Sequence, residues 1–295
     1  MSDNSKGESE MEANKIKGEA KGLTLETGTE LTYCELGAEN DEVLISGAFY
    51  FHTVMPVMEI LAQRYHVYGV VMRFDGPAEE MNADGSVNWA RQWGKDIYDF
   101  ASAMGIEKYI YFGKCHGTVP GWYIAKEHPE MMDCFASFYM LPHIKGQTSN
   151  IWFGGMAEGL EKMMSMALRK PKSGLPKKME EMASIGDSAQ SPAVAQYAAA
   201  PERIWDSIEE CDSFLKNMTI PVGYCFSNDD PVFQDYYESN IYGIMNTRGS
   251  RTVILNGEKH LMELDSPERV ASEVFGFIDE CHKGFYKEIT EPDLS

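Results

Sequence analysis

The chain has 295 residues, of which 43% are hydrophobic and 12% aromatic, and it carries a formal net charge of −20. This length accommodates one α/β domain with an insertion or two smaller domains, and the apolar content can fill a large core. The acidity argues against nucleic acids and anionic membrane surfaces as partners, because both attract clusters of Lys and Arg. A well-solvated, acidic surface accounts for the charge.

The two ends of the chain are expected to be tails, over residues 1–22 and 286–295. The first of these segments is polar and mixed in charge, as in disordered segments, and lacks the apolar stretch of a signal peptide. No window of the chain is apolar enough to span a bilayer, so we expect a cytoplasmic protein without membrane partners.

The cysteines are scattered along the chain and form no CxxC pair. In a reducing compartment they are expected to be free thiols rather than a disulfide framework. The histidines show no metal-binding spacing, and no glycine-rich phosphate loop follows the first strand of the α/β pattern. We therefore expect neither a metal nor another cofactor.

Between residues 42 and 140, short apolar runs alternate with helical patterns. Strands are predicted at 43–45, 66–72, 109–112 and 134–140. Helices are predicted at 54–64, 89–104 and 118–128. Continuous apolar strands that alternate with helices indicate a parallel sheet covered by helices on both faces.

The pattern changes over residues 141–216, which are helical and rich in methionine. Strands resume at 222–226 and 252–255, and an amphipathic helix at 267–280 follows. This order predicts an α/β core made of residues 23–140 and 217–285, with a helical cap inserted at 141–216. The alternative is that the inserted helices merely extend the core.

The sequence GKCHG at residues 113–117 stands between a predicted strand and a predicted helix. Glycines two places either side of a residue relieve the crowding of a sharp strand-to-helix turn, which exposes the central side chain above the sheet. Cys115 is therefore a candidate nucleophile. The alternative is a tight turn that holds a buried structural cysteine.

Together with its surroundings, this turn resembles the nucleophile elbow of the α/β-hydrolase family, with Cys where Ser is commoner. The resemblance extends over about residues 30 to 280. The sequence LISGA at residues 44–48 is similar to the family's oxyanion loop, with Ser46 in place of the usual His. The resemblance implies that the backbone N–H groups of Ala48 and His116 form the oxyanion hole.

Two later loops resemble those that carry the remaining members of the family's catalytic triad. The sequence SNDDP at residues 227–231 implies Asp230 as the acid, with Asp229 as the alternative. Both aspartates could instead cap the turn. The loop before the final helix implies His260 as the catalytic histidine, and a solvated surface histidine is the alternative.

A cysteine, a histidine and an aspartate can act together in catalysis. A thiol is only slightly ionised at neutral pH, so an imidazole is needed to take its proton, and a carboxylate orients that imidazole. The expected function is hydrolysis of an ester, lactone or thioester of a small, partly apolar acid through an acyl-thioester intermediate. The alternatives are acyl transfer through the same intermediate and a non-catalytic, hydrolase-like binding protein.

The expected partner is a small acyl substrate, and a homodimer is compatible with the sequence. Phe49 and His52, after the oxyanion loop, and His143, at the start of the predicted cap, are candidate pocket residues. For both histidines a surface or packing role is the alternative.

Overall fold

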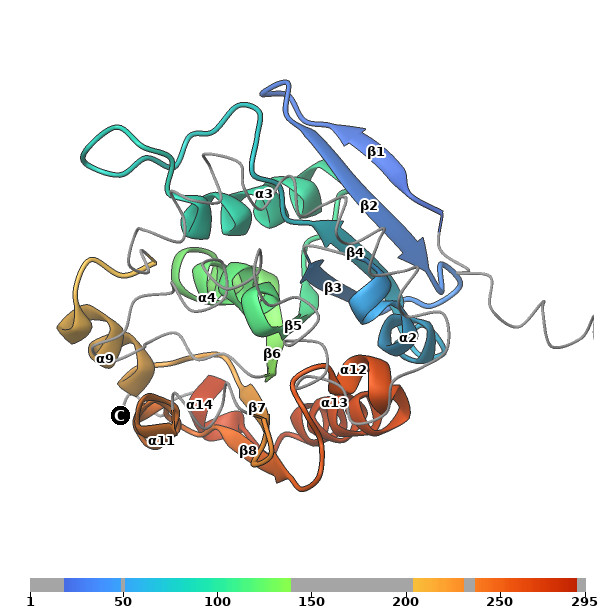
Figure 1. Cartoon of the computed structure of the whole chain (residues 1–295), viewed down its shortest axis with the longest axis vertical. Coiled ribbons are helices and arrows are strands. Elements are labelled where there is room, and N and C mark those ends of the chain that lie inside the picture. The colour runs from blue at the N-terminus through green and yellow to red at the C-terminus, as the bar shows by residue number, and fades with distance from the viewer. Residues whose placement is uncertain (1–18, 49–50, 139–203, 231–236, 291–295) are drawn as a thin grey trace, which may run out of the picture.

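The computed structural model describes residues 19–48, 51–138, 204–230 and 237–290 (Figure 1). Of the predicted cap, only residues 204–216 belong to the described part of the chain. No helix within these ranges is long and apolar enough to cross a bilayer.

Eight strands form one sheet in the order β1-β2-β4-β3-β5-β6-β7-β8. They are β1 Lys21–Thr24, β2 Glu30–Leu36, β3 Val43–Ala48, β4 His66–Val71, β5 Tyr109–Lys114, β6 Met132–Phe138, β7 Val222–Ser227 and β8 Arg251–Leu255. β1 and β2 pair antiparallel, as do β2 and β4, whereas all pairings from β4 to β8 are parallel. The carboxyl ends of β3, β5, β7 and β8 therefore lie along one edge of the sheet, the edge where parallel α/β sheets bind ligands.

Helices cover both faces of the sheet, as Figure 1 shows. The helical segments are α2 Phe51–Leu61, α3 Trp89–Ala103, η2 Cys115–Gly117, α4 Thr118–Glu127, η3 Pro129–Met131, α9 Ile208–Lys216, α11 Tyr237–Asn246, α12 Met262–Asp265, α13 Pro267–His282 and α14 Lys287–Thr290. α3, α4 and α9 contribute to the core on one face, and α2, α12 and α13 to the core on the other. The predicted parallel sheet with helices on both faces is confirmed.

The strand β5 shows how the sequence builds both cores at once. Successive side chains of a strand point to opposite faces. Tyr109 and Tyr111 are accordingly buried on the α3 and α4 face, and Ile110 and Phe112 on the α2 and α13 face. A strand buried on both faces reads as a continuous apolar run, which is why the sequence predicts it.

β1 and β2 are the strands that the sequence did not predict. β1 is mostly exposed, and buried and exposed residues alternate along the first part of β2. β2 joins the sheet by pairing with β4, where Cys34 lies opposite Gly69, and β1 joins it by pairing with β2. The first two residues of β1, Lys21 and Gly22, are also the last two residues of the predicted tail. α14 similarly falls within the predicted tail 286–295, and α9 within the predicted cap, where it packs on the main core.

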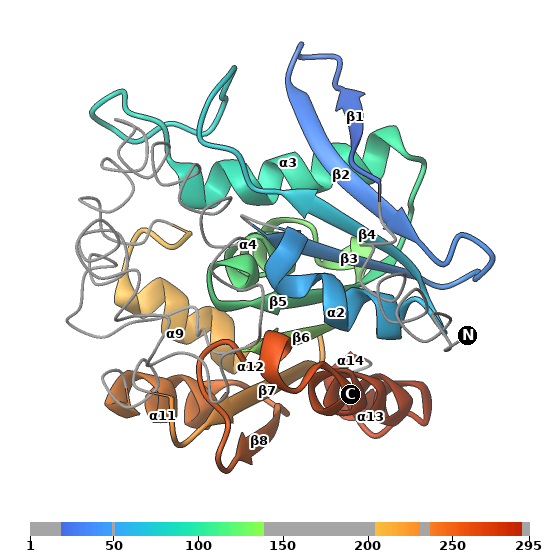
Figure 2. The same cartoon turned by 45° about the vertical axis from the view of Figure 1, so that its right-hand side comes forward.

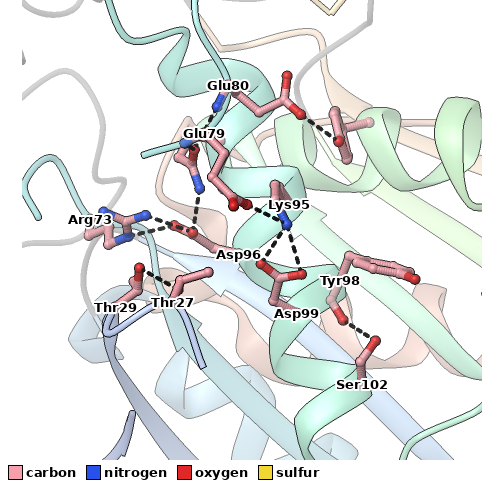
Figure 3. A network of polar contacts seen from close by, with 12 residues as sticks. Thr27, Thr29, Arg73, Glu79, Glu80, Lys95, Asp96, Tyr98, Asp99 and Ser102 are labelled. Atoms are coloured by element: carbon pink, nitrogen blue, oxygen red, sulfur yellow. Dashed lines mark hydrogen bonds and ion pairs between the residues drawn. The ribbon is translucent and has the colours of Figure 1, made fainter. Parts of the chain in front are cut away.

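A buried network holds the long connection between β4 and α3 (Figures 2 and 3). The guanidinium of Arg73, just after β4, donates to both carboxylate oxygens of Asp96 on α3, at 2.8 and 2.9 Å. Asp96 also accepts from Gln92 at 2.8 Å, and Trp93 Nε1 donates to the carbonyl of Arg73 at 2.6 Å. Burial raises the pKa of Asp96, and Arg73 opposes this shift. The network fixes the chain as it leaves the carboxyl end of β4.

Candidate active site

Cys115 is the first residue after β5, at the carboxyl edge of the sheet. Its φ of 53° lies in the left-handed region, and it is the only non-glycine residue with a positive φ in the described ranges. A side chain in this region costs about 1–2 kcal/mol, because Cβ approaches the following carbonyl oxygen. Such strain often accompanies functional sites, since the surrounding structure must impose it.

The two glycines of the elbow are required by space rather than by their own φ angles. A Cβ on Gly113 would stand 2.5 Å from the carbonyl oxygen of Gly117 and 2.6 Å from Cα of Thr118. A Cβ on Gly117 would stand 2.3 Å from the carbonyl oxygen of Gly47. The contact between Gly117 and Gly47 brings the elbow against the end of β3, where Ala48 lies.

The buried hydroxyl of Tyr111 connects these two segments. It accepts a hydrogen bond from the backbone N–H of Gly47 at 3.2 Å and donates to the carbonyl of Gly117 at 2.8 Å. Ser46, which replaces the usual histidine, has no hydrogen-bond partner for its Oγ within the described residues. Tyr111 therefore braces the loop. No feature of the sequence indicates this role, because Tyr111 resembles the other core residues of β5.

Replacing Tyr111 by phenylalanine is expected to destabilise the protein by about 2 kcal/mol, because a buried N–H and a buried carbonyl each lose a partner. Tyr109→Phe is the matched control, since its buried hydroxyl has no hydrogen-bond partner among the described residues. Urea unfolding of the two variants measures the difference. Equal losses of stability in both would contradict the bracing role.

His260 and Asp230 form a buried pair. His260 Nδ1 lies 2.8 Å from Asp230 Oδ2, and the side chains are 4% and 0% exposed. Asp230 comes from the loop after β7 and His260 from the loop after β8, two strands that pair in parallel. With Nδ1–H directed at the carboxylate, Nε2 is the ring atom suited to take up a proton.

Asp229 has a different environment. Its Oδ2 accepts from the backbone N–H of Gly257 at 2.6 Å, and its own N–H donates to Ser227 Oγ at 3.2 Å. Ser227 Oγ in turn donates to the carbonyl of Glu258. Asp229 and Ser227 thus join the loop of Asp230 to the loop of His260.

Glu258 anchors the His260 loop to the last long helix. Its side chain is only 2% exposed and lies 2.8 Å from Arg269 on α13, while Ser266 Oγ donates to the same carboxylate at 3.0 Å. Nothing in the sequence distinguishes Glu258 from a surface acid, so its role could not be predicted.

The side chain of His116 also lies at the thiol. Its Nδ1 is 3.4 Å from Cys115 Sγ, whereas the sequence predicted a role only for its backbone N–H. Burial, together with the charge of His260, lowers the pKa of His116 to about 3. His116 is therefore a neutral and weakly basic imidazole at neutral pH.

Desolvation favours the uncharged forms of Cys115 and His260. It raises the pKa of the Cys115 thiol to about 11, although the nearby charge of Lys114 acts in the opposite direction. Burial and then the charge of Lys114 lower the pKa of His260, and together they outweigh Asp230, which raises it. The resting site thus holds a thiol and a neutral imidazole, so proton transfer must accompany attack.

The other predicted pocket residues are not placed. Phe49 and His143 lie outside the described residues, and the structure describes the backbone of His52 on α2 but not its side chain. Within the described ranges, no group of three or more His, Cys, Asp or Glu could hold a metal ion.

No family model and no curated protein matches the sequence. Solved structures do. A bacterial membrane phospholipase A aligns with a TM-score of 0.72 at 16% identity, over 91% of this chain and 88% of its own. 2-Hydroxy-6-oxo-6-phenylhexa-2,4-dienoate hydrolase from Rhodococcus sp. strain RHA1 gives 0.69 at 15% identity, over 89% and 100%. A carboxylesterase from Bacillus subtilis gives 0.66 at 16% identity, over 92% and 95%. The chain therefore has the α/β-hydrolase fold.

Proposed function

We propose that this protein is an acyl hydrolase that uses Cys115 as nucleophile, His260 as general base and Asp230 as the residue that orients His260. The observation that carries the proposal is the strained backbone of Cys115 at the carboxyl edge of the sheet, the same edge that carries the buried pair of His260 and Asp230.

The chemistry follows from these groups. Cys115 Sγ attacks the carbonyl carbon of the substrate, and its proton passes to Nε2 of His260. The tetrahedral intermediate then collapses, the bond to the leaving group breaks, and His260 returns the proton to that group. Water attacks the resulting acyl-thioester with His260 again as base, which releases the acid and restores the thiol.

The developing oxyanion requires hydrogen-bond donors in fixed positions. The N–H of His116 follows the nucleophile directly, and Ala48 ends β3, which the contact between Gly47 and Gly117 holds against the elbow. These two backbone groups are the proposed donors. Tyr111 and the two elbow glycines fix the spacing between them.

The similar structures support hydrolysis as the reaction class, because a phospholipase and a carboxylesterase, by their names, both cleave esters. We propose an ester, lactone or thioester of a small, partly apolar acid as the substrate. The rise in the pKa of Cys115 to about 11 supports a mechanism that does not begin from a preformed thiolate.

The proposal is tested by comparing Cys115→Ala with the unmodified protein on p-nitrophenyl acetate, p-nitrophenyl butyrate, a γ-lactone and a butyryl thioester. We expect Cys115→Ala to lower the hydrolysis rate by about 10⁴-fold. Cys281→Ala is the matched control, because Cys281 is also partly exposed but lies on α13. Hydrolysis of none of these compounds, or full activity in Cys115→Ala, would contradict the proposal.

A further inference from the structure

A buried ion pair lies directly beside the residues of the proposed triad. Lys114 precedes Cys115 as the last residue of β5, and Glu263 follows His260 by three residues, on α12. Lys114 Nζ is 2.7 Å from Glu263 Oε1, and the side chains are 6% and 1% exposed. The pair joins the segment that carries the nucleophile to the segment that carries the base.

Burying two charges is costly, and a well-packed apolar pair is often at least as stable. Lys114 lies on the same face of β5 as Phe112 and Ile110, which pack in the apolar core with α2 and α13. Burial raises the pKa of Glu263, and the charge of Lys114 opposes that shift. An ion pair at this apolar position therefore calls for a role other than stability.

We propose that Lys114, held by Glu263, is a positioning residue of the site: its positive charge beside Cys115 and His260 keeps the imidazole neutral and able to accept the thiol proton. The role deepens the proposed function and rests on it. A cation near an imidazole disfavours the imidazolium form, whereas a carboxylate favours it. Lys114 thus offsets Asp230, which alone would promote protonation of His260.

The charges around His260 and Cys115 agree with this role. Lys114 lowers the pKa of His260 and opposes the rise in that of Cys115, while Asp230 acts in the opposite direction on both. The described charged or titratable groups on the elements around them include Lys114 on β5, His116 on η2, Asp229 and Asp230 after β7, Glu258 and Lys259 before His260, Glu263 and Asp265 on α12, Arg269 on α13 and Glu59 on α2. Of these groups, Glu258 is paired with Arg269, and Asp229 bonds to the backbone of Gly257.

The test is an NMR titration of the His260 imidazole in the full-length protein, assigned by comparison with His260→Ala. Removing the cation in Lys114→Met should raise the pKa of His260 by about one unit, and Lys114→Arg should keep the value of the unmodified protein. The double variant Lys114→Met/Glu263→Gln removes the uncompensated carboxylate, so that the titration can be measured if the single variant does not fold. It should also show a rise, smaller than that of Lys114→Met because the Glu263 carboxylate is absent as well.

The same variants give a kinetic readout. The acidic limb of the kcat/KM profile for p-nitrophenyl butyrate should move to higher pH in Lys114→Met, with about a tenfold loss near pH 6, and by less in the double variant. If the ion pair were merely structural, its removal would lower the melting temperature and leave the pKa of His260 unchanged. That result would overturn this inference. The NMR titration needs no turnover. An unchanged pKa of His260 would therefore overturn this inference alone, whereas a lack of activity at Cys115 would overturn the proposed function.

Discussion

Replacing His260 by alanine is expected to lower kcat/KM by about 10⁴-fold, the upper range for loss of a general base. The reason is the protonation state of the site. Burial raises the pKa of Cys115 to about 11, so very little thiolate exists at neutral pH without a base that takes the proton during attack. His260, buried against Asp230, is placed to supply that base.

His116→Ala is the matched control for this prediction, because His116 is also an imidazole near the thiol, with its Nδ1 3.4 Å from Cys115 Sγ. Its pKa of about 3 makes it too weak a base for this role. The variant keeps the backbone N–H that the oxyanion requires, so we expect less than about a tenfold loss of kcat/KM. If His116→Ala lost as much activity as His260→Ala, the assignment of the base would be wrong.

Replacing Gly117 by alanine is expected to destabilise the protein by about 3 kcal/mol and to abolish activity. The new Cβ would stand 2.3 Å from the carbonyl oxygen of Gly47, and both atoms belong to backbone that the sheet and the elbow hold in place. Relief requires the elbow to move away from β3, which would separate the two proposed oxyanion donors, Ala48 and His116.

Gly22→Ala on β1 is the control for this prediction, because nothing lies within 4 Å of the position of its Cβ and its φ is not positive. Chemical denaturation should show a change of less than about 0.5 kcal/mol for this variant. A Gly117→Ala protein with the stability and activity of the unmodified chain would contradict the packing of the elbow against β3.

The sequence predicted the parallel sheet because its strands are buried on both faces and read as apolar runs. β2 has charged positions, such as the exposed Glu30 and the half-buried Glu35, and β1 is mostly exposed. Only their pairing at the edge of the sheet shows that they are strands. Residues 44–48 could be likened to an oxyanion loop, but the brace of that loop by Tyr111 depends on a contact between β3, β5 and the elbow.

In the candidate site, too, some residues could be predicted from the sequence and others could not. Cys115, Asp230 and His260 stand in short motifs, each after a predicted strand, and these strands end at the same edge of the parallel sheet. Lys114 and Glu263 could not be identified as a pair, because their separation along the chain is long and neither belongs to a motif that requires a charge. Lys114 did carry a signal: it is the one charged residue at the end of an otherwise uncharged strand.

The central claim is that an acyl group becomes attached to the sulfur of Cys115. The direct test is to mix the protein with p-nitrophenyl butyrate, quench with acid within the first turnover, and locate added mass by intact-protein and peptide mass spectrometry. We predict a butyryl increment on the peptide that contains Cys115, present in Cys281→Ala and absent in Cys115→Ala. Turnover without any adduct on Cys115, or a butyryl group on another residue that disappears during turnover, would contradict the mechanism.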